Sequence, residues 1–372
     1  MKILFLQLWY DLYGGVETVN DTLASQFIQD GYDVSILCLW ECGKNEFVFS
    51  GKYQKEKINI EPKRPSYKDS IYKIVHGKLK LGFKQIFSSL ACNIQKRKDF
   101  NKFSNRIRQI NPDFIIVSNH KLISFVPKEY LSKCVMHMHS NVYKYICDKK
   151  EKKFLIKYQS KIKKVIWLTN NFAKAAIDNG ISNSSFINNP VRIRNNKNNQ
   201  LINKNIAFIG RLSAEKRVDL LSEIFKKSQL SKAGWKLNIY GTGQINNICI
   251  SDGVNLKGST KDVKKVLLNS SVLALTSSTE GFPMVVLEAY ECGVPVIAYN
   301  YGISASELIK DGNTGYIIPF DDENLYINKL NSLCNDIAKR QEMGKNAKKF
   351  VFNFYPENIA KQWYRLFKGD VK

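Results

Sequence analysis

Glu280 and Glu288 are the two side chains of this sequence that are best spaced to hold the ends of an elongated ligand. A helix is expected between them, because Pro283 suits the first helical position, where its missing N–H costs nothing. From Pro283 to Glu288 that helix would rise about 7.5 Å, at 1.5 Å per residue. The N–H groups of Gly281, Phe282 and the first turn would form an anion site between the carboxylates. A nucleotide-diphosphate sugar has this layout of sugar hydroxyls, pyrophosphate and ribose hydroxyls.

A glycine turn with two basic residues forms a second candidate phosphate site. The turn Gly210-Arg211 follows the apolar run 206–209, and a helical pattern begins at 218, after Lys216. A strand, a glycine turn and a helix are the context in which a helix N-terminus receives phosphate. Arg211 offers a planar fork and Lys216 a point charge, which suit a pyrophosphate and its leaving charge. Taken singly, each of these charged residues could be a solvated surface side chain; their order along the chain favours one shared site.

Two glycine loops are further candidates for ligand binding. Gly14-Gly15 follows the first apolar run and opens a helix, so its backbone can approach a ligand closely. A tight turn without function would have the same pattern. Gly241 and Gly243 follow an apolar strand in the second half, where they could form the floor of a base or phosphate pocket.

His139 and Asn170 each end an apolar run of the first half. Ser140 and Asn141 follow His139, which indicates a polar exit from a buried strand. A lone histidine is often a structural residue instead, and His137 on the same strand face is expected to lie deeper.

At these residues the sequence resembles the retaining glycosyltransferases of the GT-B fold, family 4. That family has a glycine–arginine turn with a lysine five residues on, followed by a Glu-x7-Glu element. Gly210-Arg211, Lys216 and the pair Glu280 and Glu288 match these motifs. The resemblance touches nearly the whole chain, strongly in the second half and loosely between 39 and 111.

The resemblance implies a role for each candidate residue. Arg211 and Lys216 would hold the diphosphate and stabilise it as it leaves. Glu280 would fix the transferred sugar, and Glu288 would hold the ribose. The remaining residues would shape the donor and acceptor sides of a cleft, with Gly258 near the base; they are His139, Gly14, Gly15, Gly241, Gly243, Gly258, Gly281, Phe282, Pro283 and Asn170.

Alternating strands and helices are expected to position these residues. Strands are predicted at 2–8, 34–39, 114–117, 135–139 and 165–168, and then at 206–209, 237–240, 254–256, 272–276, 296–299 and 315–318. Helices are predicted from about 16 to 31, at 172–179, after Pro283, and at 325–336, 340–352 and 358–367. This alternation predicts an α/β protein with two doubly wound parallel sheets, whose ligands bind beyond the carboxyl ends of the strands.

The chain of 372 residues exceeds the size at which a single core keeps growing, so two domains are expected. We predict an acceptor-side Rossmann-like domain at 1–189, an asparagine-rich linker at 190–204 and a nucleotide-sugar-binding Rossmann-like domain at 205–355. The resemblance implies that a last helix, 356–372, crosses back to the first domain and that the two domains face a central cleft.

Composition restricts the compartment and the partners. The formal net charge of +24 implies an anionic partner, such as a membrane surface, a polyphosphorylated substrate or nucleic acid. The eight cysteines include no CxxC pair, which indicates buried free thiols in a reducing compartment. The apolar run 3–6 is too short for a signal peptide, and no run approaches the roughly 20 apolar residues of a membrane span. A cytoplasmic protein, free or on the inner face of the membrane, is expected.

Two basic stretches could account for the charge. Apolar residues recur at helical spacing between 71 and 90, beside Lys73, Lys78, Lys80 and Lys84, and a second mixed stretch covers 149–164. Either these apolar stripes pack on the first domain with their lysines solvated, or they dock on anionic lipid.

The sequence therefore predicts a retaining, metal-independent hexosyltransferase with a UDP-linked donor and no cofactor. Its acceptor would be a saccharide, a polyol phosphate or a lipid-linked saccharide in bacterial surface polysaccharide assembly, such as capsule or teichoic acid. No carboxylate pair for a metal is apparent, and Arg211 and Lys216 could neutralise the leaving diphosphate. A catalytically silent GT-B partner subunit is one alternative, but it should have lost the lysine or the first glutamate. A basic nucleic-acid-binding protein is another, but no such module is recognisable.

Overall fold

The computed structural model describes all residues except 11–13, 42–52, 61–99, 198, 244–247 and 370–372. The described residues form two compact units, Met1–Met138 with Phe154–Ile166 and His139–Lys153 with Trp167–Lys372. The domain limits expected from the sequence stay predictions. The basic stretch at 71–90 lies outside the described residues.

The first sheet has seven strands in the order β3-β2-β1-β4-β5-β6-β7. Every described pair from β3 to β6 is parallel. The strands are β1 (Lys2–Trp9), β2 (Asp33–Glu41), β3 (Gln54–Ile60), β4 (Phe114–Val117), β5 (Cys134–His137), β6 (Lys164–Trp167) and β7 (Ser184–Phe186). Five of them confirm the strands expected from the sequence, and β3 and β7 were not expected. The central strands β4 and β5 are buried throughout, as is usual for parallel sheets that are covered on both faces.

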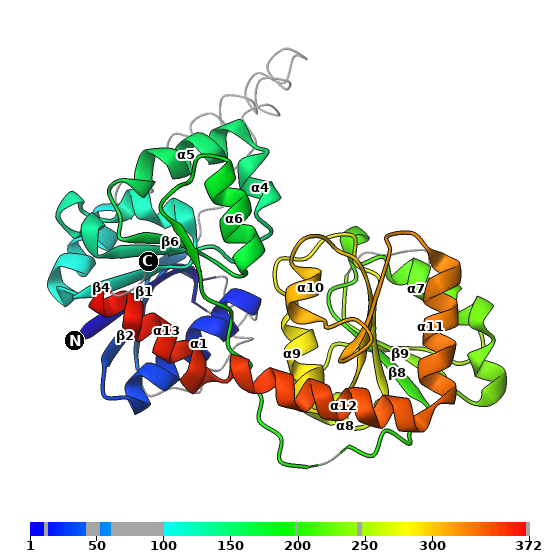
Figure 1. The fold of residues 1–372 in the computed structure, drawn as a ribbon. Helices are drawn as coiled ribbons and strands as arrows, with labels where there is room; N and C mark the ends of the chain where they lie inside the picture. The colour runs from blue at the N-terminus through cyan, green and yellow to red at the C-terminus, as the bar shows by residue number, and fades with distance from the viewer. Residues whose placement is uncertain (11–13, 42–52, 61–99, 198, 244–247, 370–372) are drawn as a thin grey trace, which may run out of the picture. The chain divides into compact units, whose positions relative to one another are not determined.

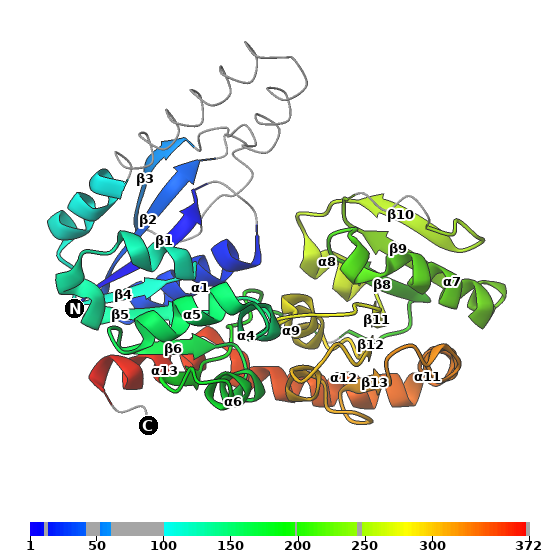
Figure 2. The same cartoon turned by 90° about the horizontal axis from the view of Figure 1, so that it is seen from above.

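The second sheet has six parallel strands in the order β10-β9-β8-β11-β12-β13, as Figure 2 shows. They are β8 (Asn205–Ile209), β9 (Lys236–Tyr240), β10 (Val254–Gly258), β11 (Val272–Leu275), β12 (Val296–Tyr299) and β13 (Gly315–Ile318). All six confirm the expected strands within two residues at each end. The predicted pair of doubly wound parallel sheets is therefore correct.

The second half of the chain supplies α7 (Val218–Ser228), α8 (Val263–Leu268), α9 (Met284–Glu291), α10 (Ala305–Leu308), α11 (Glu323–Asn335), α12 (Ile337–Val351) and α13 (Pro356–Lys368). Figure 1 shows α9 and the α7–α11 pair on opposite sides of β8 and β9. The last three helices confirm their prediction. Asp322 and Asp336 cap α11 and α12, because each side chain accepts a 2.9 Å hydrogen bond from a first-turn N–H.

The first half of the chain supplies α1 (Gly15–Gln29), α4 (Tyr143–Ile146), α5 (Lys149–Gln159) and α6 (Asn170–Asp178). Helix α1 contacts β1 and β2 and buries Val19, Leu23 and Phe27. These residues lie at the helical spacing that predicted the helix.

The described cysteines are free thiols. Cys38, Cys134, Cys292 and Cys334 are buried, Cys249 is half-buried and Cys147 is exposed. Burial raises the pKa of the Cys292 thiol to about 12, so this thiol stays protonated and unreactive at neutral pH. None of the helices described here is long and apolar enough to cross a membrane.

Candidate active site

Lys216 and Glu280 form an ion pair at the carboxyl end of the second sheet. Lys216 closes the short 3-10 helix Ala214–Lys216 after β8, and Glu280 lies four residues before α9. The Lys216 Nζ is 2.5 Å from the Glu280 Oε1, and the two side chains are only 18% and 10% exposed. The structure thus brings together two predicted catalytic residues that are 64 positions apart in the sequence.

The loop that carries Lys216 is tied to the strand end that leads to Glu280. The Thr276 hydroxyl donates to the carbonyl oxygens of Lys216 and Arg217 at 3.0 and 2.8 Å. The Ser278 N–H donates to the Glu215 carbonyl at 2.8 Å. The position of the ion pair is therefore held by the backbone on both sides.

Arg211 lies apart from this pair. Its guanidinium is 80% exposed and lies 3.3 Å from the Glu215 carboxylate, four residues on. The nearby Ser213 side chain, the Glu215 N–H and the charges of Arg211 and Lys216 lower the pKa of Glu215. Arg211 is thus accessible to a ligand, but the structure does not bring it to Glu280.

Helix α9 begins at Met284. Pro283 is its N-cap and not, as predicted, its first helical residue. A β-carbon on Gly281 would lie 3.2 Å from the Asn141 N and 3.3 Å from the His139 carbonyl oxygen, so the backbone is crowded there. The Asn141 amide donates to the Thr279 hydroxyl and to the Glu280 carbonyl, at 3.0 and 3.2 Å.

The Phe282 side chain is 7% exposed and lies against Phe354, with 6.1 Å between the ring centroids. Its predicted contribution, a backbone N–H, does not depend on this ring.

Glu288 is buried on α9 and paired with a residue that the sequence did not single out. Its side chain is 6% exposed, and its Oε1 lies 2.5 Å from the Nε of Arg192. Burial raises the pKa of Glu288, and the charge and hydrogen bond of Arg192 oppose that rise. Arg192 is therefore the cation that favours the ionised form of the buried Glu288.

Glycines of the second unit hold the ends of β8, β9 and β10 together through their backbone. Gly210 N–H donates to the Tyr240 carbonyl at 3.0 Å, and Gly241 N–H to the Gly258 carbonyl at 2.8 Å. A β-carbon on Gly241 would lie 1.8 Å from the Gly210 oxygen, and one on Gly243 would lie 1.9 Å from the Leu212 oxygen. Close packing of backbone on backbone thus accounts for Gly241 and Gly243 without a ligand.

Gly14 and Gly15 lie at the start of α1 in the first unit. Gly14 is the N-cap, and a β-carbon there would meet the Glu17 carboxylate at 2.5 Å. A β-carbon on Gly15 would meet nothing within 4 Å. The Glu17 carboxylate ends a flexible side chain that can move, so packing requires neither glycine, and both stay candidates for close approach to a ligand.

His139 and Asn170 both lie beyond the strands that they were expected to end. Strand β5 ends at His137, and His139 is half-buried with its Nε2 inside the protein. Burial lowers the pKa of His139 to about 3, so the imidazole is neutral at pH 7.

Asn170 is the first residue of α6, because Thr169 caps that helix by accepting from the Phe172 N–H at 3.2 Å. Its placement at a strand end was wrong. The N–H groups of Asn170 and Asn171 donate to the Glu307 carboxylate at 2.9 and 2.6 Å, so this helix N-terminus already holds an anion.

Across the described residues, no cluster of three or more His, Cys, Asp or Glu side chains could hold a metal ion. The residues that sequence reasoning missed are Arg192, Asn141, Glu291 and Glu307. Each acts through a partner 96 or more positions away, so no local spacing marks it.

Residues 192–350 match the family described as "Glycosyl transferases group 1". This match contains both Lys216 and Glu280, together with Arg192 and Glu288.

Three relatives carry informative names. The chain is 24% identical to an uncharacterized glycosyltransferase of Haemophilus influenzae, over 97% of this chain and 98% of the relative. It is 28% identical to a poly(ribitol-phosphate) alpha-N-acetylglucosaminyltransferase of Staphylococcus aureus, over 59% of this chain and 47% of the relative. It is 31% identical to an exopolysaccharide phosphotransferase of Streptomyces coelicolor, over 45% of this chain and 19% of the relative. The chain thus spans less than half of the last two proteins.

The fold as a whole is that of known structures. A mutant of S. aureus TarM in complex with Fondaparinux, alpha-GlcNAc-glycerol and UDP superposes with a TM-score of 0.76 at 17% identity, covering 99% of this chain and 100% of that one. This likeness confirms the GT-B fold. The two parallel sheets, the family match over 192–350 and the named relatives together support a glycosyltransferase of the GT-B fold.

Proposed function

We propose that this protein is a retaining, metal-independent hexosyltransferase of family 4 that takes its sugar from a nucleotide diphosphate. The observation that carries the proposal is the Lys216–Glu280 ion pair beside the start of α9. A nucleotide-diphosphate sugar needs a cation at its leaving phosphate and an acceptor for sugar hydroxyls within one site. These two residues supply both.

Lys216 and Arg211 would neutralise the diphosphate as it leaves. A lysine ammonium has three donor hydrogens, so Lys216 can keep its bond to Glu280 while it donates to a phosphate oxygen. Arg211 is exposed and can swing onto the second phosphate as a bidentate donor. Charge that develops on the leaving group is thereby stabilised, and no divalent cation is needed.

Glu280 would then accept hydrogen bonds from the transferred hexose, and Glu288 from the ribose. His139 is neutral at pH 7, so it would act near the sugar as a hydrogen-bonding group and not as a cation. Gly15 would let the backbone approach the ligand. Retention of the anomeric configuration is part of the proposal and is supported by the family resemblance.

The donor is proposed to be a UDP-sugar, because the similar TarM structure holds UDP. The acceptor is proposed to be a saccharide, polyol-phosphate or lipid-linked chain of a bacterial surface polysaccharide, as the names of the S. aureus and Streptomyces relatives suggest. A net charge of +24 suits an acceptor that carries phosphates. The proposed location is the cytoplasm, on or near the inner face of the membrane.

The test is a screen of UDP- and GDP-sugars for saturable thermal stabilisation. A ligand that binds only the folded state adds RT ln(1 + [L]/Kd) to its stability. The stabilising donor is then assayed for transfer with and without EDTA, and NMR reads the anomeric configuration of the first product. Absence of any stabilising nucleotide sugar would refute the function, loss of activity in EDTA the metal-free mechanism, and an inverted product the retention.

A further inference from the structure

Arg192 holds Glu288 by only one of its two carboxylate oxygens. The Arg192 Nε donates to Oε1 at 2.5 Å, and the two side chains are 19% and 6% exposed. Among the described residues, none donates a hydrogen bond to the other carboxylate oxygen of Glu288, Oε2. One oxygen is thus occupied by the guanidinium, and the other is left for a hydroxyl donor.

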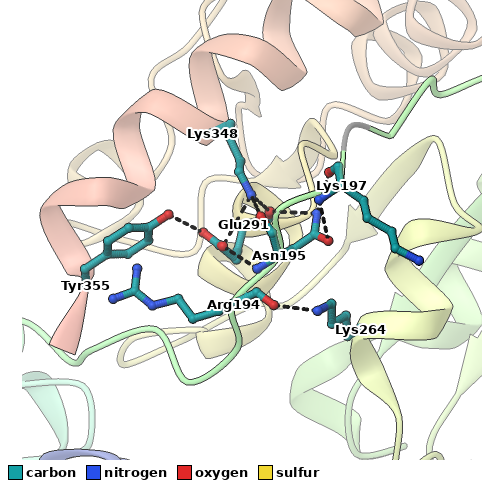
Figure 3. A network of polar contacts seen from close by, with 7 residues as sticks. All are labelled: Arg194, Asn195, Lys197, Lys264, Glu291, Lys348 and Tyr355. Atoms are coloured by element: carbon teal, nitrogen blue, oxygen red, sulfur yellow. Dashed lines mark hydrogen bonds and ion pairs between the residues drawn. The ribbon is translucent and has the colours of Figure 1, made fainter. Parts of the chain in front are cut away.

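The segment that carries Arg192 has no regular structure, so contacts with other elements fix its position. Glu291 lies one turn after Glu288 on α9 and is 1% exposed. It accepts from the Asn195 N–H at 2.7 Å and from the Tyr355 hydroxyl at 3.0 Å, as Figure 3 shows. Two buried carboxylates on successive turns of α9 therefore hold residues 192 and 195 of one segment.

Two lysines of neighbouring helices also hold the segment that carries Arg192. Lys348 of α12 donates to the Glu291 carbonyl at 2.5 Å and lies 3.3 Å from its carboxylate. Lys264 of α8 donates to the Arg194 carbonyl at 2.6 Å (Figure 3). The Asn195 amide donates to the Lys197 carbonyl at 2.7 Å, which closes a tight turn. Helices α8, α9 and α12 thus fix the backbone from which Arg192 reaches Glu288.

Stability alone does not explain a buried Arg–Glu pair, because apolar residues of similar volume are often at least as stabilising. Ionisation of Glu288 offers a reason. Burial raises the pKa of Glu288, and Arg192 counteracts this. A carboxylate can accept hydrogen bonds from two hydroxyls, whereas a protonated carboxyl gives up one acceptor position for a donor.

We propose that Arg192 is a positioning residue for nucleotide binding: it keeps Glu288 charged and in one orientation, so that the second oxygen accepts a ribose hydroxyl. This inference rests on the proposed function, because it takes the ribose as the ligand of Glu288. Glu291 serves the same purpose indirectly, because it holds the segment that carries Arg192.

The experiment compares UDP with 2′,3′-dideoxy-UDP, which lacks both ribose hydroxyls, by titration calorimetry. The wild type should bind UDP about tenfold to a hundredfold more tightly, the range for hydrogen bonds to a charged group. Arg192→Gln should bind both nucleotides alike, with the affinity that the wild type has for the dideoxy compound. A residue with a merely structural role would weaken both nucleotides and preserve the preference.

Arg194→Gln is the matched control, because it removes the same charge from the same segment. The Arg194 guanidinium lies 3.2 Å from the centre of the Tyr355 ring and pairs with Glu357, away from Glu288. This variant should keep the wild-type preference for UDP. If Arg192→Gln fails to fold, Arg192→Met, which fills the space without a charge, replaces it, and loss of the preference is again expected.

The outcomes separate the inference from the proposed function. A wild type that binds neither UDP nor GDP, nor their sugars, defeats the proposed function and with it this inference. A wild type that prefers UDP over the dideoxy compound, with the same preference in Arg192→Gln or Arg192→Met, overturns the role of Arg192 alone.

Discussion

The Lys216–Glu280 pair differs from the Lys227–Glu323 pair of the second unit in its burial. Lys227 and Glu323 lie at a similar distance, 2.7 Å, but their side chains are 55% and 29% exposed, against 18% and 10% for Lys216 and Glu280. Exposed pairs contribute about 0–1 kcal/mol to stability because water screens them. A pair withdrawn from water keeps more of its field, which is what stabilisation of a leaving phosphate requires.

Lys216→Ala should lower turnover by on the order of 10²–10³, the usual loss when one transition-state stabiliser is removed. Arg211→Ala should act in the same direction, and its stability should be unchanged because the side chain is exposed. Steady-state kinetics with the donor found in the nucleotide screen measures both effects. Lys227→Ala removes the same charge from an exposed pair and should keep wild-type turnover. Wild-type turnover in Lys216→Ala and Arg211→Ala would show that neither residue touches the diphosphate.

The two glutamates should separate binding from transfer. Glu288→Gln should weaken the binding of free UDP, whereas Glu280→Gln should leave UDP affinity nearly intact and reduce transfer and sugar discrimination. The reason is that free UDP has a ribose but no hexose. Calorimetry with UDP and a transfer assay with several UDP-sugars measure the two effects. Equal losses of UDP affinity in both variants would contradict the proposed orientation of the donor.

His139 should make the stability of the protein depend on pH. Burial lowers the pKa of His139 to about 3 in the folded state, from 6.5 for an ordinary histidine. Below pH 6.5 the unfolded chain binds a proton that the folded protein excludes, so stability falls as the pH falls from 6.5 towards 3. The loss should be about 1.4 kcal/mol for each pH decrease of one.

Denaturant titrations of wild type and His139→Gln between pH 8 and 4.5 test this dependence. The variant lacks the titrating ring, so the stability difference between the two proteins should change below pH 6.5 and stay constant above pH 7.5. A difference that does not vary with pH would mean that the ring is not shielded from protonation.

At the scale of elements, the loops after β8 and β9 pack backbone against backbone, and the loop after β9 is hydrogen-bonded to the end of β10. Gly241→Ala should destabilise the protein by about 3 kcal/mol or more, because its β-carbon would lie 1.8 Å from the Gly210 oxygen. The displaced loop also carries Arg211, so turnover should fall as well. Thermal unfolding and kinetics measure the two effects. Gly312→Ala is the control, since its β-carbon would meet open space and only its positive φ of 71° costs about 1 kcal/mol. Equal stability of the two variants would show that the loops can separate.

Most strands that the sequence predicted are buried; β10 is the exception, because only Val254 of its five residues is buried. Every position of β11 and β12 is apolar and buried, so a continuous hydrophobic run marks each strand. Strand β3, QKEKINI, has three charged residues in a row, as suits a strand that lies at the edge of the sheet among the described residues, beside β2. Strand β7 has three residues, too few to show any period. Alternation of hydrophobicity therefore could not reveal either one.

The site residues also divide into those that a local motif marks and those that only the fold brings to the site. Local motifs marked Lys216, Glu280 and Glu288, because a glycine turn and a helix start have sequence signatures. Arg192 carries no such signature: it lies in a stretch without regular structure and meets Glu288 only through the fold, 96 residues later. Gly241 and Gly243 carried a signature, but the structure explains them by backbone packing.

At the scale of the whole molecule, the net charge of +24 is the feature that the donor site does not explain. Helix α5 carries part of it. Phe154 lies 5.5 Å from the His120 ring and Leu155 is fully buried, which supports packing of this apolar stripe. Ile156 is 41% exposed beside the lysines. The other basic stretch, at 71–90, lies outside the described residues, so its role depends on experiment.

Co-sedimentation with vesicles should show binding that needs anionic lipid and falls steeply with added salt. Each lysine near such a surface contributes about 1 kcal/mol, so a cluster of several suffices for reversible binding. Binding should weaken when Lys73, Lys78, Lys80 and Lys84 are replaced by glutamate.

A matched variant makes the same change of charge at exposed positions of the second unit, namely Lys232, Lys310, Lys345 and Lys361. It should bind nearly as the wild type, because contact and not total charge decides the affinity. Equal weakening in both would mean that only net charge matters. Binding to neutral vesicles, or none at low salt, would instead assign the basic excess to an anionic polymer acceptor.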